Sequence, residues 1–342
     1  MPVLLTSLLA GTTAADQVIT PSADHARIRI SGYSDGDLHV RFADGSITSI
    51  SLLEVTRVVV SNTDRLADFN EAERYLAGGK PVQAVLRYQR ALRRASGFWP
   101  EVIRVRLVQA CDRAGQLDRA THYLLEVIAE APAVAARLFP RSIPDRATAT
   151  TRSLDQRLVT EGNSAADAEQ RLVIRLLRFW ILHRTNAPRA TAQAREVAGL
   201  AIPPDIASQT LYNVKTAALE RLLADGQSQL VLDHANATLE VCPLAAMPDL
   251  LMLKGQALLS RAADRETQLR AASAFMRLPI HFPDHERVPQ ALLLAAEIHA
   301  KLGLADDALR LLDECLDHQT VAPEIRARAE AERARLKAAT SG

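Results

Sequence analysis

The feature that most constrains the fold is a pattern of small and apolar residues that recurs every 36 or 37 positions. Counted from a Gly, an Ala follows five residues later, and apolar residues follow nine and twelve residues later. A unit of this length cannot bury its apolar face alone, so the copies must stack on one another. The copies comprise Gly79, Ala84, Tyr88 and Ala91; Gly115, Ala120, Leu124 and Val127; Ala271, Phe275 and Leu278; and Gly303, Ala308, Leu312 and Cys315.

The apolar spacing after Asp64 is typical of helices. Apolar residues recur at three and four positions, and Gly or Pro separates runs of about 12–16 residues, which predicts short helices paired in antiparallel hairpins. Scarce aromatics, at 4% of the chain, also favour helices over a sheet-rich fold. We expect a capping helix over residues 323–339. The expected helix pairs are 64–96, 100–131, 167–199, 205–241, 248–282 and 286–318.

At the repeated residues the chain resembles the tetratricopeptide repeat (TPR) family. In that family a Gly lies at the turn between the two helices, a small Ala on the second helix permits close packing, and a Pro begins the next unit. Here Pro132, Pro243 and Pro283 occupy the place of that Pro. The resemblance implies a mainly α solenoid of helical hairpins, as found in bacterial envelope TPR proteins with a small N-terminal β-module, and a role in binding proteins or peptides.

Residues 17–62 differ from the rest of the chain, because apolar and polar residues alternate there with a period of two. Strands are expected at 26–30, 37–42, 47–53 and 55–60, and Asp44-Gly45 is a strong hairpin signal. A segment of about 45 residues is too short for a large sandwich. We therefore predict a small SH3-like or Sm-like curled sheet, the β-module, which packs against the helices that follow.

The irregular stretch 140–166 divides the helical part of the chain. It contains Pro140 and Pro144, a run of Thr and Ala, and Gly162-Asn163-Ser164, which predicts a linker. The expected organisation is a leader at 1–16, the β-module at 17–62, a first array of two units at 63–139, the linker at 140–166, and a second array with its capping helix at 167–342.

Residues 1–16 have the apolar run and small residues of an export signal, with Thr13-Ala14-Ala15 before Asp16, but no basic residue precedes the apolar run. A start codon assigned too far downstream would explain this, as would a disordered or strand-forming N-terminus. We expect a periplasmic or secreted protein, with a cytoplasmic one as the alternative. No apolar stretch is long enough to span a membrane.

Motifs that would indicate catalysis are missing. The sequence contains no GxGxxG, GxxxxGK[ST], GxSxG or HExxH pattern, and its three cysteines are far apart. His281, Asp284, His285 and Glu286 could in principle be metal ligands, but they fall where one helix ends and the next begins, which favours a helix cap. Neither an enzyme nor a cofactor is expected.

One charge cluster exceeds the background of a chain whose net charge is only +1. Residues 80–119 contain nine cations and three anions, and Arg87, Arg90 and Arg94 share one helix face. A solvated helix face is one interpretation, and a surface that binds an acidic protein segment is the other. The candidate partner-binding residues are Arg87, Arg90, Arg94, Arg104 and Arg106.

The leading hypothesis is a non-catalytic scaffold that binds a protein or peptide through its helical repeats, in the bacterial cell envelope. The alternative assigns binding of a peptide or nucleic acid to the β-module, with the solenoid serving oligomerisation. Nucleic acid is not expected on the basic helix face, because no stacking aromatics accompany it. The sequence does not define the oligomeric state.

Overall fold

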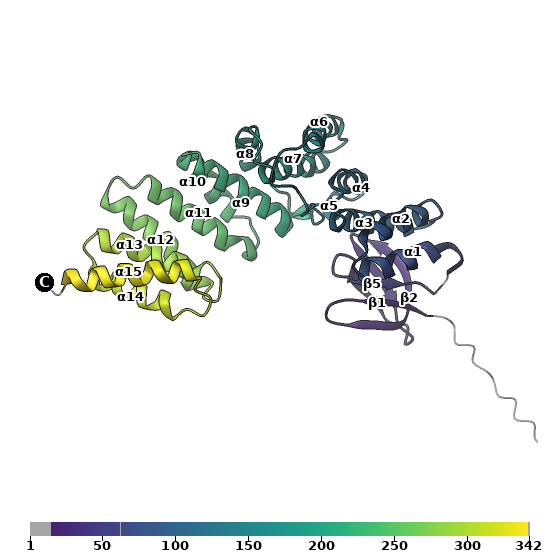
Figure 1. Cartoon of the computed structure of the whole chain (residues 1–342), viewed down its shortest axis with the longest axis horizontal. Helices are drawn as coiled ribbons and strands as arrows, with labels where there is room; N and C mark the ends of the chain where they lie inside the picture. Colours follow the sequence, from purple (N-terminus) through teal and green to yellow (C-terminus); the bar gives the residue numbers. More distant parts are fainter. Residues whose placement is uncertain (1–14, 62, 341–342) are drawn as a thin grey trace, which may run out of the picture. The chain divides into compact units, whose positions relative to one another are not determined.

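The computed structural model of the chain describes residues 15–61 and 63–340 (Figure 1). These residues form two compact units. Unit 1 comprises the chain to Pro144 together with Ala165–Gln170, and unit 2 comprises Asp145–Ser164 together with Arg171 onward. Of the predicted leader, residues 1–14 lie outside the described residues. Asp16, placed at its end by the sequence pattern, is instead a buried residue of the first strand.

The N-terminal residues form an antiparallel sheet of five strands in the order β4-β3-β2-β1-β5. Val18, Leu38 and Val58 are fully buried on its inner face, as alternation predicts. All four expected strands are confirmed, and β1 joins them because it pairs with both β2 and β5. The strands are β1 Asp16–Ile19, β2 Asp24–Ser34, β3 Asp37–Arg41, β4 Ile47–Ser51 and β5 Arg57–Val59.

Two helical hairpins follow the sheet in unit 1. Gly79 and Gly115 occupy the turns within them at a φ of +69°, a left-handed conformation that Gly adopts without strain. Ala84 and Ala120 are fully buried in the second helix of each hairpin, as are Tyr88 and Ala91. The helices are α1 Thr63–Ala77, α2 Pro81–Leu92, α3 Trp99–Arg113, α4 Leu117–Glu130 and the short α5 Pro132–Ala135. The predicted Pro132 is thus the first residue of α5.

Unit 2 continues the succession of hairpins, and each predicted helix pair is present. The predicted linker 140–166 is wrong in part, because it contains α6, whose Leu154 and Leu158 are buried one turn apart. The helices are α6 Ala149–Ser164, α7 Ala168–Arg184, α8 Ala190–Ala198, α9 Gln209–Ala224, α10 Ser228–Leu239, α11 Met247–Ser260, α12 Arg265–His281, α13 Val288–Lys301, α14 Ala305–Asp317 and α15 Pro323–Thr340, with short 3-10 turns η1 Pro204–Ile206 and η2 Leu244–Ala246.

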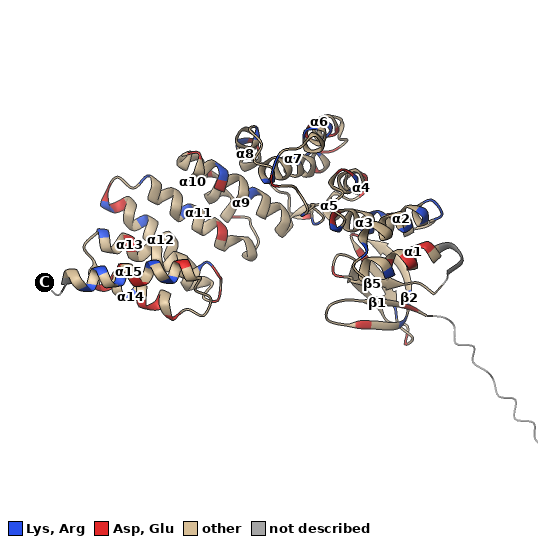
Figure 2. Ribbon diagram, in the orientation of Figure 1, with Lys and Arg blue, Asp and Glu red and all other residues tan. Residues whose placement is uncertain are grey.

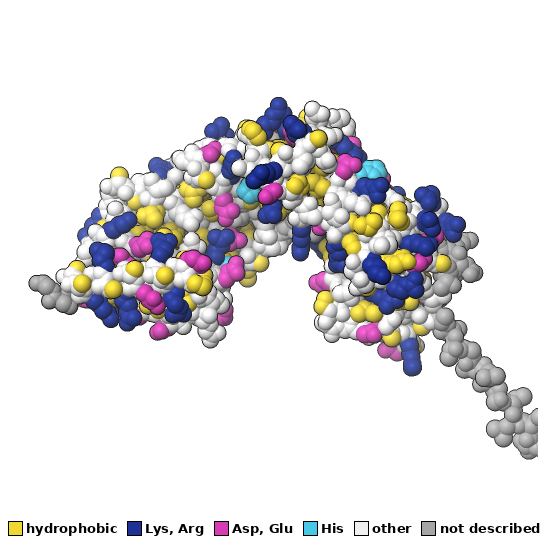
Figure 3. Space-filling model, viewed as in Figure 1, with side chains coloured by type: hydrophobic (Ala, Val, Ile, Leu, Met, Phe, Trp, Pro, Cys, Tyr) yellow, Lys and Arg dark blue, Asp and Glu magenta, His cyan; other side chains and the backbone are white. Residues whose placement is uncertain are grey.

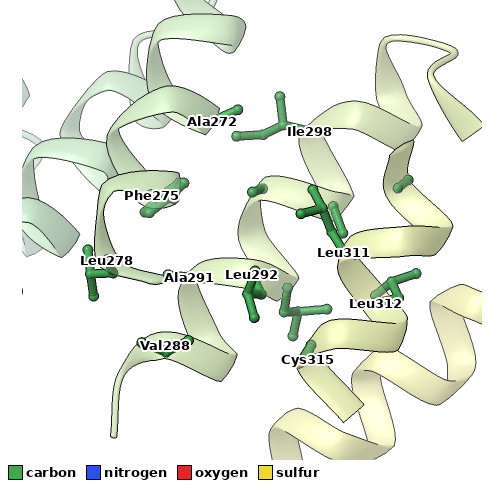
Figure 4. Packing of buried hydrophobic residues seen from close by; sticks show 14 of the residues in the cluster. Ala272, Phe275, Leu278, Val288, Ala291, Leu292, Ile298, Leu311, Leu312 and Cys315 are labelled. Atoms are coloured by element: carbon green, nitrogen blue, oxygen red, sulfur yellow. The ribbon is translucent and has the colours of Figure 1, made fainter. Parts of the chain in front are cut away.

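The core of unit 2 is apolar and closely packed (Figure 4). Phe275 of α12 and Leu312 of α14 are fully buried, and the small Ala271 and Ala308 occupy the positions predicted for close helix approach. Gly303 lies in the turn between α13 and α14 at a φ of +77°, and Pro283 follows the end of α12. The repeated pattern of the sequence is therefore the packing pattern of the hairpins.

The described residues thus form a mainly α, TPR-like succession of helical hairpins, preceded by a small antiparallel sheet. Within residues 15–61 and 63–340, no helix combines the length and the apolar character that crossing a membrane requires.

Candidate functional site

The predicted basic face of α2 is largely neutralised by acidic residues of α1. Arg87 Nη1 lies 3.0 Å from Asp68 Oδ1 and 3.1 Å from Glu71 Oε2. Arg94 is 3.8 Å from the same Asp68, with 72% of its side chain exposed, and Arg90 is exposed. Figure 2 shows cations of α2 beside anions of α1. The cluster that appears strongly positive in the sequence is therefore mixed in charge on the surface.

The two candidate arginines of α3 also form ion pairs with acidic residues of unit 1. Arg104 lies 3.1 Å from Glu126 and 2.7 Å from Glu130, both on α4. Arg106 is only 1% exposed and forms a two-pronged ion pair with Glu73. Its assignment to a partner-binding surface is therefore wrong, because no partner could reach its guanidinium without unfolding this part of the protein.

Glu73 and Arg106 are the centre of a buried polar network that joins the sheet to the helices. Arg106 donates to both carboxylate oxygens of Glu73 and, at 2.9 Å, to the carbonyl of Val55. The Tyr88 hydroxyl donates to Glu73 Oε1, and the Val58 amide donates to Oε2. Burial, and then the Glu73 charge, raise the pKa of Tyr88, which keeps this hydroxyl a donor. The network fixes the β-module on the first hairpins.

The same face of α1 also covers the free edge of β5. Asn70 accepts from the Val60 amide at 2.8 Å and donates to the Val60 carbonyl at 2.7 Å, as a neighbouring strand would. Glu73 satisfies the Val58 amide one turn later. Asn70 and Glu73 therefore both serve the sheet edge.

A groove in unit 2 is the best candidate for a binding site. It encloses about 820 Å³, with α10 and α12 as its walls and α11 as its floor. Four cationic side chains, Lys254, Arg261, Arg270 and Arg277, line it, and none of them forms an ion pair in the described structure. Burial lowers the pKa of Lys254, and Arg277 and Arg270 lower it further. No carboxylate contributes to the shift of Lys254, whereas Arg270 helps to lower the pKa of Asp264 and is therefore partly compensated.

The acidic residues that also line this groove are concentrated towards the start of α12. Asp264 caps α12, since its carboxylate accepts from the Thr267 amide at 2.7 Å, and these hydrogen bonds lower its pKa. Asp233 of α10 accepts from Gln229. Lys254 and Arg277, by contrast, lie nearer the other end of the groove, because they occupy the middle of α11 and the last turns of α12.

An apolar pocket of about 970 Å³ adjoins the groove at that end, and Arg277 lines both. Leu244, which is 71% exposed, lies at its rim. On the face of unit 2 seen in Figure 3, Lys and Arg side chains lie among exposed apolar ones. An apolar pocket next to cations that form no ion pair suits a ligand with an apolar and an anionic part. The pocket is also lined by Leu239, Met247, Pro248, Leu251, His281, Phe282 and His285.

The turn that could have held a metal forms part of this pocket instead. His281 ends α12, and the Nδ1 of His285 accepts from the Arg287 amide at 3.2 Å within the turn, which makes it a turn-stabilising residue. Among the described residues, no group of three or more His, Cys, Asp and Glu side chains is arranged to hold a metal ion.

The sequence patterns missed the groove because its residues come from three helices. Lys254, Arg270 and Arg277 are isolated charges in the sequence, and only the packing of α10, α11 and α12 brings them together. The one available signal was the spacing of Arg270 and Arg277 by seven residues, which places them on one helix face.

No protein-family model and no curated protein matches the chain. Among solved structures, it is similar to the crystal structure of yeast Tom70, with 13% sequence identity and a TM-score of 0.34. The match covers 82% of this chain and 66% of that one, so the chain spans just under two thirds of the length of this neighbour.

Proposed function

We propose that the protein is a non-catalytic interaction scaffold whose unit 2 groove binds a peptide segment with an apolar anchor followed by acidic residues. The observation that carries the proposal is the pair Lys254 and Arg277, which form no ion pair in the described structure and lie beside an apolar pocket. Stacked helical hairpins form grooves of this kind, which can bind extended or helical peptide segments.

The spacing of the lining residues defines the spacing within the ligand. Leu251 lines the apolar pocket, and Lys254 lines the groove one helical turn further along the same face of α11. Arg277 lies where the two meet. An acidic residue within a few positions of the apolar anchor would therefore reach Arg277 and Lys254, and a second one would reach Arg270.

A fluorescent peptide of twelve residues, with one Leu followed by Glu at alternate positions, tests this proposal by anisotropy. We expect saturable binding, and a loss of at least about tenfold in affinity on Lys254→Glu with Arg277→Glu, because two attractive charges become repulsive. The matched control is Arg175→Glu with Lys301→Glu, two exposed cations of unit 2 outside the groove. An equal loss in both variants would show only a net-charge effect and contradict the proposal.

The apolar part of the site has its own test. Leu251→Asp would risk the core, so the better change is Leu244→Ser at the exposed rim. This change is expected to weaken binding of the Leu-containing peptide, while binding of a peptide with Ala in place of Leu should not change. A uniform effect on both peptides would rule out an apolar anchor at this pocket.

The proposal includes a location in the cell envelope, supported by the export-like character of residues 1–16. Cleavage before Asp16 would leave β1 intact, since that strand begins at Asp16. Fractionation of cells expressing a C-terminally tagged chain, with N-terminal sequencing of the product, tests this. A cytoplasmic product that retains residues 1–15 would contradict it.

A further inference from the structure

A second pocket, in unit 1, has a different chemistry. It encloses about 790 Å³ where the β-module meets the first helices. Three arginines of the sheet line it, Arg27 and Arg29 of β2 and Arg41 of β3, together with the rings of Phe42 and Trp99. None of the three arginines has a hydrogen bond or ion pair in the described structure, in contrast to Arg87 and its acidic neighbours on α1.

Arg29 and Arg41 are direct register partners in the antiparallel pair of β2 and β3. Their side chains therefore project from the same face of the sheet, directly opposite each other on neighbouring strands. Like charges directly opposite each other destabilise a sheet. An anion held between the two guanidinium groups would remove that repulsion.

Arg27 reaches the pocket through an irregular backbone. Its φ is +56°, in the left-handed region that side chains other than those of Gly, Asn and Asp seldom adopt. The register of β1 against β2 shifts at this point, between the pairs of Asp16 with Ile28 and Val18 with His25. Such bulges redirect a side chain and often adjoin binding sites.

Asp16 is the only carboxylate among the described residues that line this pocket, and both of its oxygens accept hydrogen bonds. It is 7% exposed, and its two oxygens accept from the Ile30 amide and from the amide and hydroxyl of Ser61, each at 2.8 Å. Among the side chains that the structure describes, the guanidinium groups therefore have no free carboxylate within their own pocket.

The aromatic side of the pocket is half-buried. Trp99 packs its ring against Phe69 and Phe98, at centroid distances of 5.2 and 5.0 Å, and has no hydrogen-bond partner for its indole nitrogen in the described structure. This ring is held by those contacts and lines the same pocket as the sheet arginines. A bound anion would therefore change its surroundings.

We propose that this pocket binds a phosphate-bearing ligand with at least two negative charges. Each guanidinium presents a fork of donors that matches phosphate oxygens, and a tetrahedral phosphate offers acceptors in several directions to three forks at once. The volume suits a ligand of nucleotide size. The site lies in unit 1 and is independent of the peptide groove proposed for unit 2.

Trp99 serves as the reporter, because Trp180 is the only other tryptophan and can be replaced by Phe. In the full chain carrying Trp180→Phe, pyrophosphate and a nucleoside monophosphate are expected to change the Trp99 fluorescence saturably. The double change Arg29→Gln with Arg41→Gln should lower the affinity for pyrophosphate and for the nucleoside monophosphate by at least about tenfold each. The control variant carries Arg90→Gln with Arg113→Gln, two exposed cations of unit 1 outside the pocket, and should bind both ligands with unchanged affinity.

The stability of the free protein separates a ligand site from a structural role. Since Arg29 and Arg41 repel each other, Arg41→Gln alone should raise the midpoint of urea unfolding without ligand, while it lowers phosphate affinity. A lower midpoint would show that Arg41 supports the fold and would overturn the argument from repulsion. Equal binding of citrate, a carboxylate of similar charge, would overturn the assignment to phosphate.

Two further probes identify the source of the phosphate. Tighter binding of the nucleoside monophosphate than of pyrophosphate would indicate a soluble ligand whose ring contacts Phe42 or Trp99. A fluorescence change only with vesicles of phosphatidic acid in phosphatidylcholine would indicate a lipid headgroup, since its phosphomonoester can carry two negative charges. Either result supports the site, whereas no response to any phosphate probe would overturn it.

Discussion

In unit 1 a buried ion pair fixes how the sheet meets the helices, whereas in unit 2 the helices are positioned by the shapes of apolar side chains. Glu73 and Arg106 are 0% and 1% exposed and are joined by two hydrogen bonds. The corresponding centre of unit 2 contains Phe275, Leu312 and small residues that let the helices approach. A buried polar network is stable only when each of its groups is paired, whereas an apolar core requires mainly side chains of the right volume.

Each unit carries its own reporter for testing this difference. Cys111 in unit 1 and Cys315 in unit 2 are both fully buried, and burial raises the pKa of each to about 11. Their thiols should react with a labelling reagent only when the surrounding helices open. A chain with Cys242→Ala therefore reports the opening of the two units separately, by mass spectrometry of the labelled peptides.

The largest expected effect follows from Arg106→Met. Removal of one partner leaves the Glu73 charge buried and unpaired, which costs about 3–5 kcal/mol in free energy of unfolding. Urea unfolding measures the loss, and faster labelling should be confined to Cys111. The exposed Arg113→Met is the control on the same helix. A loss below about 1 kcal/mol would mean that the ion pair does not hold unit 1 together.

A smaller loss is expected in unit 2 from Gly255→Ala. An added Cβ would lie 2.4 Å from Cε1 of Phe275, so overpacking should cost about 1–3 kcal/mol and outweigh the helix propensity that Ala gains. Labelling of Cys315 should accelerate, and Phe275→Leu should partly rescue the variant.

Gly162→Ala is the matched control for that change. Its Cβ would meet Ile174 at 3.4 Å, an ordinary contact, so unit 2 should be unchanged or slightly more stable. If Gly255→Ala behaved in the same way, shape would not be the property that positions α11 and α12.

Arg87→Gln should have a still smaller effect, although it removes two ion pairs. The Arg87 side chain is 32% exposed and its partners Asp68 and Glu71 lie near the surface, where solvent screens ion pairs, so thermal unfolding should show a much smaller loss than for Arg106→Met. A loss similar to that of Arg106→Met would mean that burial does not distinguish the two arginines.

The smallest effect should have the opposite sign. Burial raises the pKa of Glu220, only partly offset by Arg287 at 3.6 Å. Because its pKa is higher folded than unfolded, Glu220 should add stability as the pH falls through the folded pKa, and cost stability above it. Glu220→Gln should therefore slightly raise the unfolding temperature at neutral pH and reduce its pH dependence. A lower unfolding temperature at neutral pH would contradict this.

Much of this architecture could be predicted from local patterns. Turn and helix-contact positions are confirmed, because they depend on residues that are close together in the sequence. They are Gly79, Gly115 and Gly303 at turns, and Ala84, Ala120, Ala271 and Ala308 at helix contacts. The pairing of charges could not be predicted, since Arg106 meets Glu73 across 33 residues. The same limit concealed the groove, because its cations lie on separate helices until α10, α11 and α12 pack.

The dependence of the sheet on Arg106 sets an order of events during synthesis. The strands leave the ribosome first, but the Val55 carbonyl receives its donor from a residue 51 positions downstream. The edge of β5 likewise waits for Asn70 and Glu73. The β-module is therefore complete only after α3 has emerged, and a nascent chain halted before that point would display an unfinished strand edge.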